Sequence, residues 1–224
     1  MKHLPFDAII FDHDGTLVDT ETPDFRAWQT LYKEHGTIIT LDHWANVAVG
    51  HMNGYAYLFD DLIKKSNNGT NQADLQRRLR ELWDITLLDT QLLPGVELLL
   101  RELRAHEYRL AVATAADLTW VTRWLTKFNL LSYFETVANR DDVVNNKPAP
   151  DVYLLAAERL GVRPERCLVF EDSVAGVQAA KAAGMTVVAV PNQVTKTLDF
   201  HQADLIISSL EDVTITWIES LRQT

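Results

Sequence analysis

Hydrophobic residues along the chain gather into short, uninterrupted runs that polar segments separate. Five runs have the length and β-branched content of strands buried on both faces, and a weaker run covers residues 136–138; the five are 6–11, 110–114, 167–170, 186–190 and 205–207. Runs of this kind are typical of central strands in parallel sheets.

Segments with helical spacing alternate with these runs in the second half of the chain. They cover residues 118–128, 152–160, 174–183 and 210–221. The alternation indicates right-handed βαβ units. The pattern therefore predicts an α/β fold with a Rossmann-like, doubly wound parallel sheet.

Residues 20–93 interrupt this rhythm, because they contain no run typical of a buried strand. Their apolar residues recur at helical spacing instead, at 25, 28, 31 and 32 and again at 75, 79, 82 and 83. Loop signals at 66–69 and 93–95 divide and close the segment. We predict a catalytic core of residues 1–19 and 94–224, with a helical cap of residues 20–93 inserted after the first strand and hinges near Thr20–Glu21 and Leu93–Gly95.

Composition narrows the possible partners. The 224 residues include 21 basic and 31 acidic side chains, and the formal net charge of −10 argues against nucleic-acid and polybasic membrane binding. The chain has one cysteine, Cys167, which fits a reducing compartment, and it has no apolar stretch of about 18 residues. The segment from Phe6 to Phe11 is followed by acidic residues, unlike a signal peptide. We expect a cytoplasmic monomer with no nucleic-acid or membrane partner.

Candidate chemistry follows the strands, where ligands of open α/β sheets bind. Asp12 and Asp14 come directly after the first run, and Gly15 permits a sharp turn away from the sheet. Two carboxylates at this spacing lie on the same side of an extended chain and repel each other unless a cation or a proton relieves them. The alternative is an acidic turn that caps a helix.

Two further segments could contact a phosphate. Thr114 ends the second run, and its hydroxyl and the neighbouring backbone N–H groups can hold phosphate oxygens, although Thr114 or Asp117 could simply cap the next helix. Lys147 lies in a proline-restricted loop and could supply a fixed positive charge, or could be a solvated loop lysine.

A second acidic pair, Glu171 and Asp172, follows the run 167–170. Carboxylates from two strand ends are costly to bring together without a divalent cation, and oxygen ligands suit Mg²⁺. The alternative is a helix cap in which Ser173 and the acids face a helix N-terminus.

Taken in order, these motifs resemble those of the haloacid dehalogenase-like hydrolases, in the branch of phosphatases and phosphosugar mutases with a helical cap. The resembling segments are Asp12 to Glu21, Ala111 to Thr114, Lys147 to Asp151, and Glu171 to Ser173 followed by Gly176, Ala179, Ala180, Ala183, Gly184 and Met185. The resemblance covers the whole core.

The resemblance implies a role for each of these residues. Asp12 would attack phosphorus, and Asp14 would protonate the leaving oxygen and then activate water. Thr114 and the Ala115 N–H would hold the phosphoryl group, and Lys147 would spread its charge. Mg²⁺ would be bound by Asp12, the backbone carbonyl of Asp14 and Asp172, with Glu171 nearby or ligating through water; Thr16 and Ser173 would support the site. The second aspartate excludes the dehalogenase reaction, which uses neither that group nor Mg²⁺.

The cap decides between phosphatase and mutase. Phosphoglucomutases of this branch carry a histidine where this chain has Asp24, and a basic pair around a glycine that matches Gly50. The loop 48–53 has no Lys or Arg to bind a second phosphate, which favours a phosphatase.

The substrate is expected to be a small phosphorylated metabolite, of the sugar phosphate or phosphoglycolate type. His51 and Asn53 are candidates for contacting the leaving group, although His51 could instead cap a helix. We expect Trp28, Trp44 and Trp83 to pack the cap helices. A phosphosugar mutase of the β-phosphoglucomutase type and a non-catalytic binding protein are the alternatives.

Overall fold

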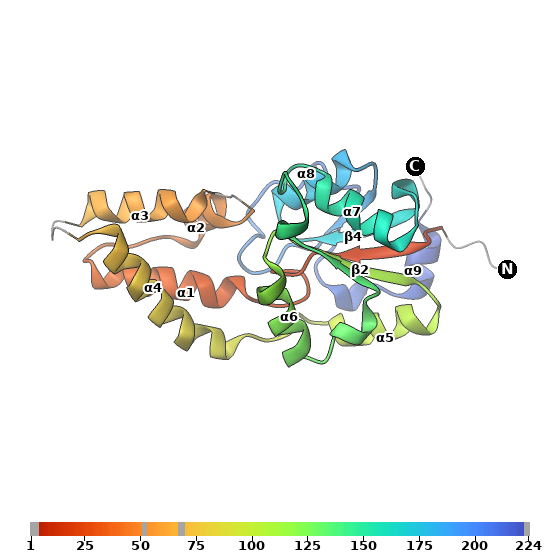
Figure 1. Ribbon diagram of the computed structural model, residues 1–224, viewed down its shortest axis with the longest axis horizontal. Coiled ribbons are helices and arrows are strands. Elements are labelled where there is room, and N and C mark those ends of the chain that lie inside the picture. Colours follow the sequence, from red (N-terminus) through yellow and green to blue (C-terminus); the bar gives the residue numbers. More distant parts are fainter. Residues whose placement is uncertain (1–4, 51–52, 67–69, 222–224) are drawn as a thin grey trace.

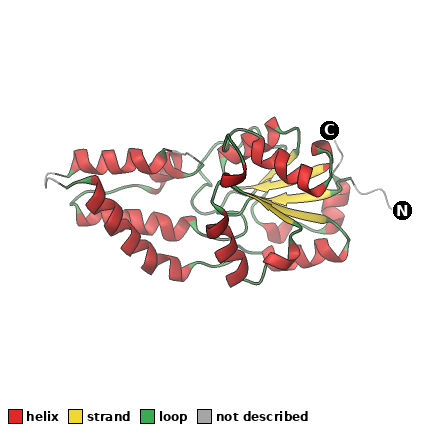
Figure 2. Ribbon diagram, in the orientation of Figure 1, coloured by secondary structure: helices red, strands yellow, loops and turns green. Residues whose placement is uncertain are grey.

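Six parallel strands form one sheet in the order β3-β2-β1-β4-β5-β6 (Figures 1 and 2). The computed structural model describes residues 5–50, 53–66 and 70–221. The strands are β1 (Ala8–Phe11), β2 (Arg109–Ala113), β3 (Thr136–Ala138), β4 (Cys167–Glu171), β5 (Thr186–Ala189) and β6 (Leu205–Ile206). The predicted α/β fold with a doubly wound parallel sheet is confirmed.

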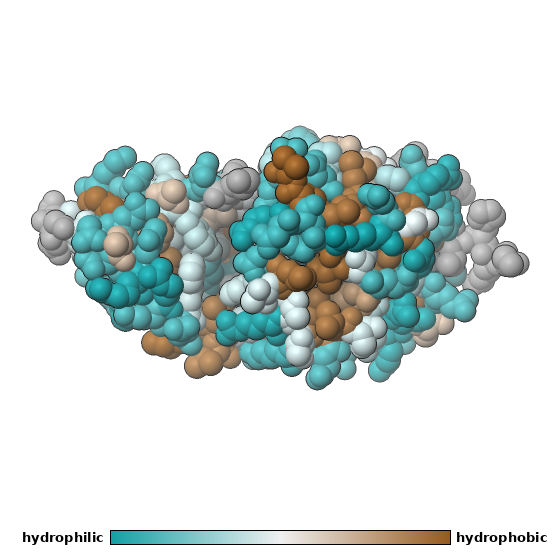
Figure 3. Space-filling view, viewed as in Figure 1, coloured by the Kyte–Doolittle hydropathy of each residue, from teal (hydrophilic) through white to brown (hydrophobic). Residues whose placement is uncertain are grey.

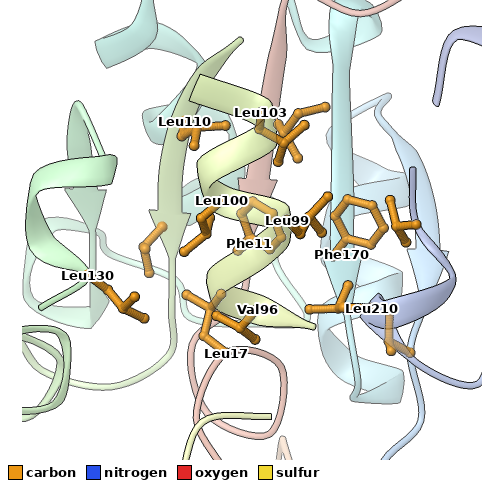
Figure 4. Close-up of a cluster of buried hydrophobic side chains, with 14 of the residues drawn as sticks. Phe11, Leu17, Val96, Leu99, Leu100, Leu103, Leu110, Leu130, Phe170 and Leu210 are labelled. Atoms are coloured by element: carbon orange, nitrogen blue, oxygen red, sulfur yellow. The ribbon is translucent and has the colours of Figure 1, made fainter. Parts of the chain in front are cut away.

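Alternate strand residues serve two hydrophobic layers, as the period of two in a strand requires. Ile9 and Phe11 pack on one side of the sheet, against α5 (Val96–Ala105), α6 (Leu118–Lys127) and α9 (Ile215–Ser220). Figure 4 shows α5 crossing this side, with its leucines against Phe11 and Phe170. Ala8 and Ile10 pack on the other side, against α7 (Asp151–Leu160) and α8 (Val174–Ala182).

Four helices lie beyond one end of the sheet, at the left of Figure 1. They are α1 (Glu21–Glu34), α2 (Leu41–Ala48), α3 (Gly54–Lys65) and α4 (Gln72–Thr86). Their apolar faces bury a separate cluster that includes Trp28, Trp44 and Leu58, to which the rest of the chain adds Val194. Full burial of one such side chain stabilises the fold by about 1.5–3 kcal/mol, which explains why these helices pack on one another.

Two predictions of secondary structure near the C-terminus are wrong. The run 205–207 was expected to be buried, but β6 is an edge strand in which Leu205 is 37% and Ile206 is 58% exposed, because no strand covers its outer side. The helix expected over 210–221 is broken into a short 3₁₀ turn and α9. Thr214 causes this break, since its side chain accepts a hydrogen bond from the Trp217 N–H and begins α9 there.

Short 3₁₀ turns complete the elements, at Leu87–Asp89, Leu131–Tyr133, Arg140–Asp142, Pro164–Arg166 and Leu210–Asp212. The surface in Figure 3 is hydrophilic over most of this face, with hydrophobic residues in smaller groups. Within the described part of the chain, no helix is both long and apolar enough to cross a membrane.

Candidate active site

Asp12 and Lys147 meet at the carboxyl ends of the central strands. Strand register places Asp12 directly beyond the pairing of Phe11 with Phe170 and Val112, and its N–H donates to the Phe170 carbonyl. Lys147 Nζ lies 2.5 Å from Asp12 Oδ1 and 3.0 Å from the Ala113 carbonyl oxygen. Lys147 is therefore held above the ends of β1 and β2 and is not a solvated loop lysine, since only 5% of it is exposed.

Glu171 anchors the other side of this lysine. Its Oε1 accepts hydrogen bonds from Lys147 Nζ at 2.7 Å and from Tyr153 Oη at 2.8 Å. Its Oε2 accepts from the Ser173 N–H at 2.8 Å and from the Ser173 hydroxyl at 3.0 Å. Each Glu171 oxygen thus accepts two hydrogen bonds from protein donors, whereas Thr16 and Asn192 donate one to each oxygen of Asp172, so Glu171 has less capacity than Asp172 for a direct metal contact.

Asp172 is held by groups from both halves of the chain. The Thr16 hydroxyl donates to Oδ1 at 3.0 Å, and the Asn192 amide donates to Oδ2 at 2.8 Å. The same amide also donates to Glu21 and to the Gly15 carbonyl. Gly15 has φ +79°, and a Cβ there would lie 2.2 Å from Asp172 Oδ2, so both the turn and the close approach require glycine.

Asp12, Glu171 and Asp172 each offer an oxygen within 4.8 Å of the other two, and all three are buried. Burial raises the pKa of Asp12 to about 7, although Lys147 opposes the shift. Burial and the charges of Glu21, Glu171 and Asp12 raise the pKa of Asp172 well above its usual range. Lys147 supplies one positive charge for these three carboxyl groups, and hard oxygen donors with the repulsion that remains fit a divalent cation such as Mg²⁺.

Asp14 points toward different partners from those of Asp12. Its Oδ1 accepts from the Thr20 hydroxyl at 2.7 Å and from the Trp120 indole N–H at 2.8 Å, and His13 Nδ1 lies 3.2 Å away. Burial by itself would raise the pKa of Asp14, but His13 and these hydrogen bonds outweigh it and lower the pKa. Asp14 is therefore a carboxylate held between the core helix α6 and the start of α1.

The remaining predicted residues have mixed outcomes. Thr114 is buried beside the site, and its hydroxyl accepts from the Ala116 N–H at 3.1 Å, while the Ala115 carbonyl accepts from Asn146 at 3.3 Å. Asn53 is exposed just before α3, and His51 lies outside the described residues. Two helix caps that the sequence left open as alternatives are present, since Asp117 begins α6 and Ser173 begins α8.

Sequence reasoning missed four residues that contact the site: Thr20 as a partner of Asp14, Trp120, Tyr153 and Asn192. Thr20 belongs to a motif that the sequence singled out. Trp120 and Tyr153 lie on helices, where an aromatic residue is normally read as core, and Asn192 lies in the loop after β5. Their contacts with Asp14, Glu171 and Asp172 join positions 18–106 residues apart in the chain.

The chain belongs to the haloacid dehalogenase-like hydrolase family, whose profile matches residues 6–184. It is 38% identical to YhcW of Bacillus subtilis, over 92% of this chain and 93% of that protein. It is 36% identical to the fructose-1-phosphate phosphatase YqaB of Escherichia coli, over 82% of this chain and 95% of YqaB. The fold is similar to the crystal structure of CbbY from Rhodobacter sphaeroides in complex with xylulose-(1,5)bisphosphate. The TM-score is 0.74 and the sequence identity is 28%, over 92% of this chain and 96% of CbbY.

These similarities confirm three predictions: the family, the fold class and an enzyme of the phosphatase class.

Proposed function

We propose that this protein is a Mg²⁺-dependent phosphatase that hydrolyses the monophosphate ester of a small carbohydrate through an aspartyl-phosphate on Asp12. The observation that carries the proposal is the position of Asp12, between the Lys147 ammonium at 2.5 Å and the carboxylates of Glu171 and Asp172. The name of the relative YqaB, a fructose-1-phosphate phosphatase, supports a phosphorylated carbohydrate as the substrate.

In the first step a carboxylate oxygen of Asp12 attacks phosphorus, and the bond from phosphorus to the leaving oxygen breaks. The negative charge of the bound phosphate favours the protonated form of Asp14, which donates its proton to that oxygen, and Lys147 offsets the charge that spreads over the phosphoryl group. Thr114 and the Ala115 N–H hold the phosphoryl oxygens. In the second step Asp14 takes a proton from water, the water attacks phosphorus, and inorganic phosphate leaves with Asp12 restored.

Asp12 and Asp172 would hold the Mg²⁺, together with the backbone carbonyl of Asp14, and Glu171 would act through water. When bound, the ion lowers the repulsion between the carboxylates and the anionic ester. The loop 48–53 has no Lys or Arg, which supports hydrolysis over the mutase reaction, because a mutase must bind a second phosphate.

The test is phosphate release from a panel of phosphorylated metabolites with Mg²⁺ or EDTA, run beside an assay for glucose 6-phosphate from β-glucose 1-phosphate. Mg²⁺-dependent phosphate release supports the proposal. Glucose 6-phosphate without phosphate release would establish the mutase instead. Metal binding without turnover of any ester would leave a binding protein.

Without a bound metal ion, the stability of the fold should depend on pH. Burial raises the pKa of Asp12 to about 7 and that of Glu21 to about 8. A carboxyl group whose pKa is higher in the folded chain favours folding while it is protonated, and this contribution is lost as pH rises through the folded value. In EDTA, we therefore expect the melting temperature to fall between pH 5.5 and pH 8.5.

Mg²⁺ should reverse much of this loss, since it binds the ionised carboxylates. At a concentration one hundred times its Kd it would stabilise the fold by about 2.7 kcal/mol. Differential scanning fluorimetry should show a larger Mg²⁺ effect at pH 8.5 than at pH 5.5, and a much smaller one in Asp172→Asn. Equal shifts at both pH values would contradict the assigned ligands.

We further propose that residues 20–93 form a cap that closes over the core formed by residues 1–19 and 94–224. Gly50 lies against the core, because a Cβ there would sit 2.9 Å from Ala175 Cβ and 3.6 Å from Ser173 Oγ. Ser173 follows the acidic pair directly. The close approach at Gly50 thus brings a loop of the cap to the edge of the active site.

Gly50→Ala tests this closure. An added methyl group would force the loop away from Ala175, and we expect kcat/KM to fall at least about 10-fold, since small misplacements near a site are costly. Gly36→Ala is the matched control, because Gly36 has nearly the same φ, +72° against +73°, with no atom within 4 Å of an added Cβ. If Gly50→Ala and Gly36→Ala lower kcat/KM equally, backbone strain explains both effects, and the proposed contact between cap and core is refuted.

A further inference from the structure

Three polar groups at the core-facing end of the helices take no part in the proposed catalytic steps. Asp24, in the first turn of α1, accepts a hydrogen bond from the Tyr55 hydroxyl on Oδ2 and one from the Trp83 indole N–H, at 2.6 Å, on Oδ1. The Tyr55 ring lies 5.8 Å from the Trp83 ring and 5.4 Å from that of Trp28. We call Asp24, Tyr55 and Trp83 the cap triad.

The cap triad lies beside Asp14. The Asp24 N–H donates to the Thr20 carbonyl at 3.3 Å, and the Thr20 hydroxyl donates to Asp14, so Asp24 lies one helical turn from the group that holds Asp14. Residues four apart share one face of a helix. Trp83 packs against both the hydrophobic cluster of the sheet and that of the cap helices.

Access to the cap triad comes through Tyr55, which is 37% exposed at the start of α3. Its position is five residues after Gly50, the point where the same segment approaches Ala175 and Ser173. Figure 1 shows α1 and α4 each with one end toward the sheet, and Asp24 and Trp83 occupy those ends. The cap triad therefore lies at the core-facing end of the cap helices, on the side of Asp14.

Acidic side chains surround the cap triad on the side of the core. Burial raises the pKa of both Glu21 and Asp24, and the charge of Asp14 adds to each rise, so the three acids lie near one another. His13 lies 3.2 Å from Asp14, but no ion pair of Asp24 with a Lys, Arg or His is found among residues 5–50, 53–66 and 70–221. A second phosphate or a carboxylate on a substrate would meet like charge there, which is strongly disfavoured. A neutral hydroxyl could instead donate to Asp24, and the C–H face of a sugar could pack on the aromatic rings.

We propose that the cap triad determines specificity by accepting a neutral, hydroxyl-bearing leaving group and rejecting one that carries a second anionic group. Within the proposed function, on which this inference rests, the substrates are then monophosphates of sugars and sugar alcohols. Bisphosphates and phosphorylated carboxylic acids such as phosphoglycolate are poor substrates. Asp24 supplies the repulsion, while Tyr55 and Trp83 hold its carboxylate in place.

Two matched pairs of esters test this proposal. Fructose 1-phosphate differs from fructose 1,6-bisphosphate only in the second phosphate, and 2-hydroxyethyl phosphate differs from phosphoglycolate in a hydroxymethyl group in place of the carboxylate. Burial raises the pKa of Asp24 to about 7, so kcat/KM is measured at pH 8, where its carboxylate is charged. We expect the neutral member to be favoured at least about 10-fold in each pair.

Asp24→Asn should reduce this preference at least about 10-fold, because it removes the charge and keeps the shape. Asp60→Asn is the control, since it removes one charge from an exposed position on α3 and should leave the preference unchanged. If Asp24→Asn does not fold, the unmodified protein provides the test. Raising NaCl from 20 to 500 mM should weaken its discrimination against the anionic esters, because salt screens repulsion.

The outcomes separate this inference from the proposed function. Absence of Mg²⁺-dependent phosphate release from every ester overturns both. Efficient release with equal or better use of the anionic esters, or an unchanged preference in Asp24→Asn, overturns the cap triad assignment alone and leaves the phosphatase intact.

Discussion

Asp12→Asn is expected to lower kcat at least about 10⁴-fold and to abolish formation of the phosphoenzyme. An amide is a poor nucleophile, and no other carboxylate oxygen in the described cluster stands both at the end of β1 and against Lys147 at 2.5 Å. The loss corresponds to about 5 kcal/mol of transition-state stabilisation. Initial rates on the best ester, together with acid-quench trapping of phosphoprotein, measure it.

The fold should survive this substitution, because asparagine keeps the shape of Asp12 and removes a charge from a buried acidic cluster. Asp199→Asn is the surface control, since its side chain is 78% exposed. Circular dichroism should give the same spectrum for both variants. Near-normal turnover in Asp12→Asn would mean that another group is the nucleophile, and Asp12→Ala would then be tested in the same way.

Lys147→Ala is expected to lower kcat/KM at least about 100-fold, or about 2.7 kcal/mol. The ammonium contacts Asp12, Glu171 and the Ala113 carbonyl at once, so its charge is fixed where phosphoryl charge develops. Although burial alone would lower the pKa of Lys147, the charges of Asp12 and Glu171 raise it. Lys147 is therefore cationic throughout the working range.

The same substitution should also destabilise the fold, by about 3–5 kcal/mol at pH 8, because it leaves two buried carboxylates without their partner. Lowering the pH to 5.5 should reduce this penalty, because burial raises the pKa of Asp12 to about 7 and protonation of Asp12 removes one of the two charges. Lys181→Ala is the control: Lys181 pairs with Asp204 at 2.7 Å at the surface, where such a pair contributes about 0–1 kcal/mol. A loss of activity below about threefold would show that Lys147 is dispensable for the chemistry.

Hydrophobic pattern was sufficient for most of the fold. The runs at β1, β2, β4 and β5 are buried on both faces, as continuous apolar strands of a parallel sheet must be. The pattern failed at β6, because an edge strand and a central strand can carry the same apolar residues. It also failed at 210–221, where the apolar periodicity runs without a break but Thr214 caps a new helix at Ile215.

The residues of the site also divide into those that the order of the strands predicts and those that depend on packing. Asp12, Thr114 and Asp172 follow strands directly and Glu171 ends β4, so parallel register alone brings them to one edge of the sheet. Lys147 follows no strand of its own, and its position depends on how its loop and α7 pack on β2. Trp120, Tyr153 and Asn192 reach the site from helices and loops whose orientation is set only when the layers assemble.

By itself, the sequence determined the class of fold, the helical segment that follows the first strand and the acids at the strand ends, because local periodicity and strand order are written along the chain. Only the tertiary structure decided which donors contact each carboxylate. Thr20 and Trp120 donate hydrogen bonds to Asp14. Tyr55 and Trp83 donate hydrogen bonds to Asp24. Such contacts join residues 6–106 positions apart. Side-chain directions at that separation follow from packing, which no local pattern specifies.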